Sequence, residues 1–248
     1  MSGELRVGTS GWSYKHWLEV FYPKQLQPQQ WLAYYSRHFD TVEINNTFYH
    51  LPQETTVRKW YSTVPGGFIF AMKLSRFITH QKKLRQVDDA LDRFIECMAP
   101  LREKTGPILI QLPPNLPFHA ETVRAFFELI TRRLPHQRFA VEPRHESWFA
   151  APCLELYREF NIALCMADSG NVFPELDRVT ADWIYLRFHG RDGLYQGNYT
   201  EEMLRPFARR SVQWLRSGFD VFAYFNNDIA GFAVQNARLL REMIQQQL

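Results

Sequence analysis

Residues 107–112 read Pro-Ile-Leu-Ile-Gln-Leu, an almost continuous apolar run that is ended by two further prolines. Residues 120–134 follow, and their apolar side chains recur with the period of one helical face: Val123, Phe126, Phe127 and Ile130. A strand that is apolar on successive residues must be covered on both sides, which is typical of parallel sheets flanked by helices. This stretch therefore predicts one strand followed by one covering helix.

The same alternation runs along the whole chain. Expected strands cover Leu5–Thr9, Thr41–Ile44, 68–73, 107–112, 138–142, 162–166, 183–189 and Asp220–Phe225. Expected helices cover 28–37, 55–64, 87–98, 120–134, 153–160, Glu201–Arg216 and 229–245, with only a weak helical pattern after the sixth strand. About eight strand–helix units in 248 residues are typical of a (β/α)₈ barrel.

A doubly wound open sheet is the competing architecture. It would place a GxGxxG turn after the first strand, and Gly8-Thr9-Ser10-Gly11 does not match that pattern. No composition shift or Gly/Ser-rich linker divides the chain. We therefore expect an α/β fold, a single (β/α)₈ TIM-type barrel, with residues 1–248 forming one domain.

Composition excludes several classes of protein. With 46% hydrophobic and 15% aromatic residues, the chain has enough material for a core, and no apolar run reaches the length of a membrane span. The first residues lack a secretory signal, so we expect a cytoplasmic protein with no membrane partner. The net charge of +3 is slight, and the basic pairs lie on expected helix faces, so nucleic acid is not the expected partner: Arg132-Arg133 and Arg209-Arg210.

Polar side chains gather where the expected strands end. Successive strand residues alternate between barrel interior and helices, so the apolar neighbours of each polar residue tell which way it points. This pattern directs into the barrel mouth, or places just beyond the strands, Glu43, Asn45, Lys73, Gln111, Glu142, Arg144, Asp168, Arg187, His189 and Asn226. Barrel enzymes build their sites at this end. We also expect an aromatic wall of Trp12, Tyr49 and Trp148 from the adjoining loops.

These strand ends resemble signature segments of the YecE-like family, domain of unknown function 72. The matching segments are Gly8-Thr9-Ser10-Gly11-Trp12-Ser13-Tyr14, Val42-Glu43-Ile44-Asn45-Asn46-Thr47-Phe48-Tyr49, Ile78-Thr79-His80, Gln111-Leu112-Pro113-Pro114, Glu142-Pro143-Arg144-His145-Glu146-Ser147-Trp148, Leu186-Arg187-Phe188-His189-Gly190 and Phe225-Asn226-Asn227-Asp228. The resemblance covers about residues 7–245. It implies a TIM-type barrel and supplies no activity, so the function must be argued from the site.

Two catalytic hypotheses use the carboxylates. Glu43 and Glu142 could serve as the acid and the base or nucleophile of a glycosidase-like hydrolase, although a Glu43–Lys73 ion pair would make Glu43 a poor acid. Alternatively, a divalent Mg²⁺, Mn²⁺ or Zn²⁺ ion could be held by Glu43, Glu142, Asp168 and His189. The spacing shows no metal motif, and interleaved cations oppose a metal, so no cofactor is expected outside this alternative.

The third hypothesis is a small anionic ligand, phosphorylated or carboxylated. Lys73, Arg144 and Arg187 are three cations, and arginine suits bidentate recognition of an oxyanion. His189 would then be the general acid or base, because its ordinary pKa lies near neutrality. We expect carboxylates to neutralise part of this charge and to leave a guanidinium near Arg187 and His189 for the anion. A hydrolase, lyase or isomerase would fit such a site, and a non-catalytic interaction or nucleic-acid-binding protein is the alternative.

Overall fold

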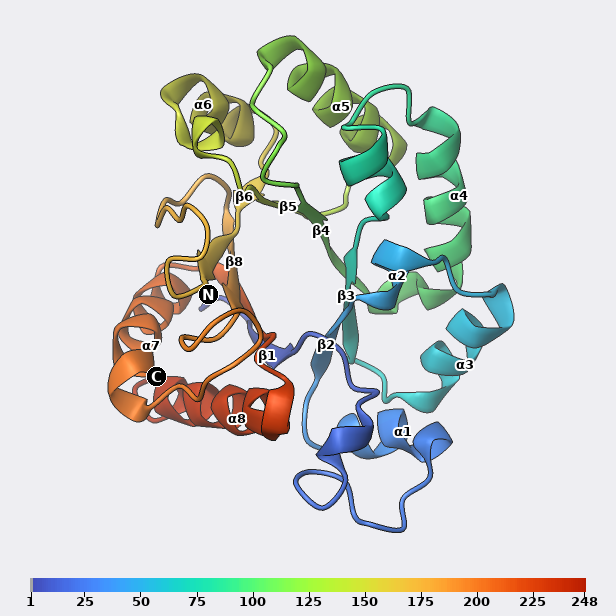
Figure 1. Cartoon of the computed structure of the whole chain (residues 1–248), viewed down its shortest axis with the longest axis vertical. Coiled ribbons are helices and arrows are strands. Elements are labelled where there is room, and N and C mark those ends of the chain that lie inside the picture. The colour runs from blue at the N-terminus through green and yellow to red at the C-terminus, as the bar shows by residue number, and fades with distance from the viewer. Residues whose placement is uncertain (1) are drawn as a thin grey trace.

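A ring of parallel strands surrounded by helices forms the protein, as the computed structural model shows for residues 2–248 (Figure 1). The strands are β1 (Leu5–Thr9), β2 (Thr41–Ile44), β3 (Ile69–Lys73), β4 (Thr105–Gln111), β5 (Phe139–Glu142), β6 (Ala163–Leu164), β7 (Met166–Asp168), β8 (Trp183–Phe188) and β9 (Asp220–Phe225). The predicted TIM-type barrel is confirmed. Met1 lies outside the described residues, and the extent of the expected domain, 1–248, stays a prediction.

Helices lie outside the ring and follow one another around it in chain order (Figure 1). They are α1 (Trp31–Tyr35), α2 (Asn46–Tyr49), α3 (Glu54–Thr63), α4 (Asp88–Met98), α5 (Ala120–Arg133), α6 (Ala151–Glu159), α7 (Glu201–Arg216) and α8 (Phe232–Gln245). Their apolar faces and the outer faces of the strands form the large hydrophobic core. The helices therefore bury the side of each strand that the alternation predicts to face away from the barrel axis.

Most elements lie within two residues of their expected bounds, and three differ for local reasons. The expected helix 28–37 is a 3₁₀ turn at Pro28–Gln30 followed by the short α1. The expected strand 162–166 breaks at Cys165 into β6, which pairs with β5, and β7, which pairs with β8. The expected helix 229–245 begins late, because Ala230 and Gly231 adopt left-handed conformations before Phe232.

The strands form two sheets with a seam between β1 and β2. One sheet has the order β1-β9-β8-β7 and the other β2-β3-β4-β5-β6, so the chain itself passes from one sheet to the other at Cys165. At the opposite seam the hydroxyl of Tyr35 takes the place of backbone pairing. It accepts a hydrogen bond from the Thr9 N–H at 3.0 Å and donates one to the Thr41 carbonyl at 3.0 Å. The side chain of Tyr35, on α1, thus joins the two sheets.

Gly8 allows this close approach. A Cβ atom at Gly8 would lie 2.4 Å from the Thr41 carbonyl oxygen and 3.1 Å from the Tyr35 hydroxyl. Real Cβ atoms do not approach backbone this closely, so a side chain here would push β1 away from β2. The glycine is required by packing at the seam.

A second, smaller hydrophobic cluster fills the barrel. Its members come from alternate strand positions and are Ala71, Leu109, Ala140, Ala163, Cys165, Ala181, Trp183, Tyr185, Phe222 and Tyr224. Small side chains on β3, β5 and β6 face large aromatic ones on β8 and β9, so the interior is filled asymmetrically. This apolar plug forms the floor on which the polar strand ends lie.

Removing the Tyr35 hydroxyl tests the seam. We expect Tyr35→Phe to lower the free energy of unfolding by about 2–4 kcal/mol, because a buried N–H and a buried carbonyl lose their partner. The measurement is urea unfolding followed by circular dichroism. Tyr34→Phe, on the same helix, is the matched control and should cost about 0.5 kcal/mol or less. Equal effects of the two substitutions would contradict the bridging role.

Candidate ligand site at the barrel mouth

A layer of polar side chains lies above the apolar plug at the C-terminal ends of five strands, β3, β4, β5, β8 and β9. Each of five inward plug residues is followed two positions later by a polar side chain, in the pairs Ala71 and Lys73, Leu109 and Gln111, Ala140 and Glu142, Tyr185 and Arg187, Tyr224 and Asn226. Because successive inward residues are two apart, both members of a pair face the barrel axis. Parallel strands bring these C-terminal ends to one mouth.

Arg187 is the centre of this layer and has no exposed surface. Its Nε and Nη2 donate to the two carboxylate oxygens of Glu43 at 3.0 and 2.7 Å, and its Nη1 donates to Glu142 at 2.5 Å. Glu43 also accepts hydrogen bonds from Ser10 at 2.7 Å and from Tyr185 at 2.6 Å. One guanidinium therefore joins two carboxylates across the barrel.

Both carboxylates are held ionised. Burial opposes ionisation of Glu43, but the charge and hydrogen bonds of Arg187, with those of Tyr185 and Ser10, outweigh it and lower its pKa. Burial likewise opposes ionisation of Glu142, and Arg187, His189 and Arg144 together hold its pKa well below the ordinary value. Neither side chain is suited to donate a proton near neutral pH.

His189 is enclosed by protein. Its Nε2 lies 3.2 Å from Glu142, its Nδ1 lies 3.3 Å from the Asn226 amide nitrogen, and the Phe173 ring covers it edge-on at 5.3 Å. Burial lowers its pKa, which the charge of Glu142 only partly opposes. The expected general acid or base is thus a neutral imidazole with no exposed surface.

Lys73 is the exception in the layer. It keeps 7% of its surface, its ammonium nitrogen lies 4.2 Å from the centre of the Phe48 ring, and within residues 2–248 that nitrogen has no hydrogen bond and no ion pair. The Glu43–Lys73 ion pair that the sequence suggests does not form, because Arg187 donates hydrogen bonds to both carboxylate oxygens of Glu43. Burial, followed by the charge of Arg187, lowers the pKa of Lys73 to about 7.

Two further polar groups face the mouth beside Lys73. Arg144, whose side chain is 14% exposed, donates to Glu142 at 3.1 Å and lies 4.5 Å from the centre of the Phe173 ring. Gln111 is 5% exposed, and its side chain has no hydrogen bond to the rest of residues 2–248. Lys73, Arg144 and Gln111 therefore retain capacity for an external ligand.

Asp168 has a different place from the one expected. Its carboxylate accepts hydrogen bonds from Arg191 at 2.6 Å and from the Tyr199 hydroxyl at 3.1 Å. These contacts hold the loop after β8, and they leave Asp168 apart from the Glu43–Arg187–Glu142 network. Within residues 2–248, no three histidine, cysteine, aspartate or glutamate side chains are arranged to hold a metal ion. The four candidate metal ligands do not form one cluster.

The expected aromatic wall is only partly present. Trp12 and Tyr49 line one hollow of about 290 Å³ together with Asn45, and Tyr49 is 59% exposed. Asn45 donates to the Ser10 carbonyl at 3.2 Å, and its side-chain oxygen has no partner within residues 2–248. Trp148 is instead 1% exposed and donates to the Leu116 carbonyl at 2.7 Å, because it packs the loop after β4. The expectation for Trp148 was wrong.

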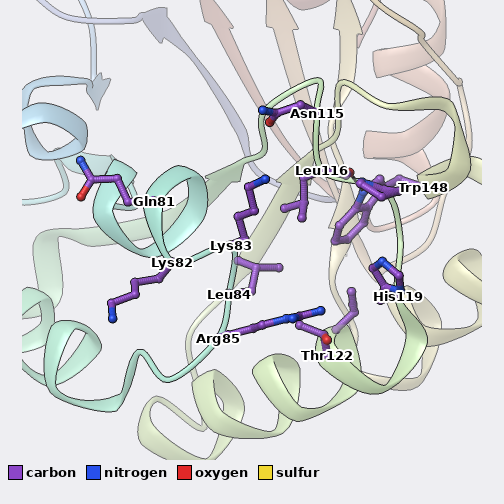
Figure 2. A pocket seen from close by; sticks show the side chains of 12 residues that line it. Gln81, Lys82, Lys83, Leu84, Arg85, Asn115, Leu116, His119, Thr122 and Trp148 are labelled. Atoms are coloured by element: carbon purple, nitrogen blue, oxygen red, sulfur yellow. Dashed lines mark hydrogen bonds between the residues drawn. The ribbon is translucent and has the colours of Figure 1, made fainter.

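A second hollow lies outside the mouth, between the loops after β3 and β4 (Figure 2). It has a volume of about 340 Å³, and its rim carries Lys83, Arg85 and His119. Lys82, also at this rim, points away from Trp148 in Figure 2. The backbone of Lys83 is left-handed, with φ of 49°. This hollow is therefore a second basic surface, separate from Lys73 and Arg144.

The sequence directs Tyr185 inward but assigns no role to it, to Ser10 or to Phe48, and all three help to organise the mouth. Ser10 and Tyr185 complete the hydrogen bonds of Glu43, and Phe48 supports Lys73. The two-residue period does direct Tyr185 inward, so that signal was available. Phe48 lies on the single-turn helix α2, which no periodic pattern revealed.

Residues 6–248 match the family described as "Protein of unknown function DUF72". The chain belongs to the DUF72 family. Among its relatives, the UPF0759 protein YecE of Escherichia coli K12 is 31% identical over 146 residues, which cover 59% of this chain and 50% of YecE. The chain thus aligns with about half of YecE. The UPF0759 protein YunF of Bacillus subtilis is 26% identical, over 97% of this chain and 94% of YunF.

Solved structures agree with the family and the fold. A DUF72 family protein of Thermotoga maritima superposes with a TM-score of 0.87 at 29% identity, over 98% of this chain and 99% of that chain. A fusion protein described as xylose isomerase-like TIM barrel/4-hydroxyphenylpyruvate dioxygenase gives 0.53 at 14% identity, over 100% of this chain and 44% of that chain, a likeness of fold alone. Within residues 2–248, no helix is long and apolar enough to cross a membrane.

Removing the central guanidinium tests the network. At about pH 7.5, we expect Arg187→Met to lower the free energy of unfolding by about 3–5 kcal/mol, because buried Glu43 loses its only counter-charge within residues 2–248 and Glu142 keeps only Arg144. Burial then raises the pKa of the unpaired Glu43 above its unfolded value, so the folded variant gains stability as the pH falls. Wild-type carboxyl pKa values are lowered, so their contribution persists down to about pH 4.5.

The destabilisation by Arg187→Met should therefore be clearly smaller at about pH 5.5 than at about pH 7.5. Urea unfolding of both proteins at the two pH values measures it. Adding Glu43→Gln and Glu142→Gln to Arg187→Met should remove this pH dependence, because no carboxylate then remains. A pH-independent penalty in Arg187→Met would show that the arginine acts through packing alone.

Proposed function

We propose that the barrel mouth binds a small carboxylate or phosphate compound, and that Lys73 and Arg144 supply the positive charge. The observation that supports this most directly is the ammonium group of Lys73, which is nearly buried and has no counter-ion within residues 2–248. A buried charge is costly unless it is paired. An anion at the mouth would provide the missing partner.

The charge balance of the layer supports an anion. Two ionised carboxylates, Glu43 and Glu142, face two guanidinium groups, Arg187 and Arg144. His189 has a lowered pKa and is neutral. Protonated Lys73 is therefore one positive charge in excess. A monoanionic ligand restores neutrality without displacing any existing pair.

The proposed ligand lies beside Lys73 and Arg144, whereas the sequence suggested a place beside Arg187 and His189. Arg187 and His189 have no exposed surface, and the guanidinium already binds both carboxylates. An anion beside Arg187 would have to compete with Glu43 and Glu142 in the barrel interior. Lys73 and Arg144, which are partly exposed, can receive it at the surface of the same network.

The glycosidase-like alternative has less support. It needs one protonated carboxyl with a raised pKa beside an ionised one. Glu43 and Glu142 both have lowered pKa values and share one arginine. The metal-dependent alternative would require Asp168 to leave Arg191 and join the other three candidate ligands. The anion-binding function requires neither change.

The pH dependence of binding tests the role of Lys73. The pKa of Lys73 lies at about 7, so the free site loses its excess charge as the pH rises through that value. We expect the affinity for glucose 6-phosphate or pyruvate, measured by calorimetry, to fall by up to about tenfold per pH unit above 7, because binding then requires a proton. Glucose should show much weaker binding and no such dependence.

Matched variants locate the site. Lys73→Met should abolish the pH dependence and weaken binding about tenfold or more, since it removes the titrating charge. Lys83→Ala and Arg85→Ala, in the hollow of Figure 2, should leave binding unchanged. Binding that is lost in those two variants and kept in Lys73→Met would transfer the anion to the outer hollow. Equal binding of glucose and glucose 6-phosphate would contradict the anionic ligand.

A further inference from the structure

We infer that Lys73 is a nucleophile that forms an imine with the carbonyl carbon of its ligand, and that the ligand class is therefore a 2-oxo acid or a related carbonyl compound with an acidic group. This inference rests on the proposed anion site and narrows its substrate class. In this arrangement Arg144 binds the acidic group of the ligand, and the amine of Lys73 adds to its carbonyl carbon.

The position of the amine supports this role. Lys73 is the last residue of β3, at the end of the barrel where the mouth opens. Its nitrogen has no hydrogen bond within residues 2–248 and still reaches solvent, although the residue as a whole is only 7% exposed. Because no acceptor holds its protons, the nitrogen lone pair becomes available on deprotonation without breaking a hydrogen bond.

Lys104 is a second buried lysine, and its contacts show how a buried lysine serves a purely structural role. Lys104 is 6% exposed, and its nitrogen lies 4.4 Å from the centre of the Tyr61 ring, much as Lys73 lies over Phe48. However, its amine donates to two carbonyl oxygens, of Tyr61 at 2.7 Å and of Val64 at 2.8 Å. Lys104 also precedes β4 and so lies at the opposite end of the barrel. Burial with hydrogen bonds to two carbonyl oxygens is a structural use of lysine, and Lys73 has no such bonds in the described part of the chain.

The charged groups around Lys73 keep part of it as free amine at neutral pH. Arg187 from β8 and Arg144 after β5 disfavour its protonation, whereas Glu43 from β2 and Glu142 from β5 favour it. His80, in the turn after β3, also faces it, and burial lowers the pKa of His80 to about 4, so the imidazole is neutral. With burial, the outcome is a pKa of about 7 for Lys73. About half of the amine is then unprotonated at pH 7, against less than about 0.1% of an ordinary lysine.

The step balances without an oxidant or a reductant. The lone pair of neutral Nζ adds to the carbonyl carbon, the C=O π electrons move to oxygen, and one proton passes from nitrogen to that oxygen to give a carbinolamine. The nitrogen lone pair then expels hydroxide, which takes a proton from water or buffer and leaves as water, and a protonated C=N bond remains. The iminium carries the one positive charge that the layer has in excess, and the acidic group of the ligand neutralises it.

Reductive trapping tests the inference. The intact protein is incubated with pyruvate and sodium cyanoborohydride between about pH 5.5 and 8.5, and modified lysines are located by peptide mass spectrometry. We expect a carboxyethyl group on Lys73 in at least about tenfold preference over any other lysine, with none on Lys104. The initial labelling rate of Lys73 by neutral acetaldehyde should rise with a midpoint near pH 7, following its free amine.

Lys73→Arg separates this inference from the proposed function. Arginine keeps the positive charge, so pyruvate should still bind in calorimetry, while the adduct at position 73 is lost. Lys73→Met provides a second test if the arginine variant fails to fold, as judged by circular dichroism. In that variant both the adduct and the pH-dependent binding should disappear.

The remaining outcomes distinguish the imine at Lys73 from simple binding of an anion. Pyruvate binding that depends on Lys73 without any trapped adduct would overturn the imine and leave the anion site intact. Labelling spread evenly over surface lysines would overturn the inference as well. An adduct at Lys73 that forms equally well from acetaldehyde and pyruvate, with no detectable anion binding, would support the nucleophile but refute both the acidic substrate class and the proposed function.

Discussion

The bridge from Arg187 to Glu43 and Glu142 is the interaction on which the rest of the mouth depends. A single guanidinium with no exposed surface donates to two carboxylates on different strands, β2 and β5, of the sheet opposite its own. Desolvating three charges is tolerated only because they neutralise one another with well-formed hydrogen bonds. Glu142 also contacts His189 and Arg144 and so fixes their positions, while burial, aided by the charge of Arg187, lowers the pKa of His189 and keeps it neutral.

Pairing within this network determines which groups are left for a ligand. Glu43, Glu142 and Arg187 pair with one another, which removes them from acid–base chemistry. What remains is the amine of Lys73, whose pKa is lowered by burial and then by the charge of Arg187, and to which no group of the network is hydrogen-bonded. A structural ion cluster and a reactive lysine are therefore parts of one arrangement, since the charge of Arg187 that ties the carboxylates also disfavours protonation of Lys73. Lys104 is buried to a similar extent, but two carbonyl oxygens hold its amine, so burial alone does not leave an amine without partners.

The two sheets are joined in different ways at their two seams, and both affect the mouth. At Cys165 the strand itself changes partner, from β5 to β8, close to Glu142. At the β1–β2 seam, Tyr35 connects the backbones where Ser10 and Glu43 follow. The seam therefore positions the carboxylate at one end of the Arg187 bridge, and fold stability and site geometry share the same contacts.

The sequence by itself determined the strand and helix order, the barrel and the inward direction of the polar strand ends, because hydrophobic periodicity and chain length are local properties. It also placed Lys73, Glu142 and Arg187 two residues beyond apolar interior positions. Only the tertiary structure decided the pairing among them. Several cations and carboxylates converge at the mouth, and no local rule determines which of them pair. The sequence therefore suggested that Arg187 was free and that Lys73 was paired with Glu43. In the structure Arg187 pairs with Glu43 and Glu142, and Lys73 has no ion pair within residues 2–248. Asp168 and Trp148 were misplaced for the same reason, since loop packing is long-range and depends on contacts that no periodic pattern encodes.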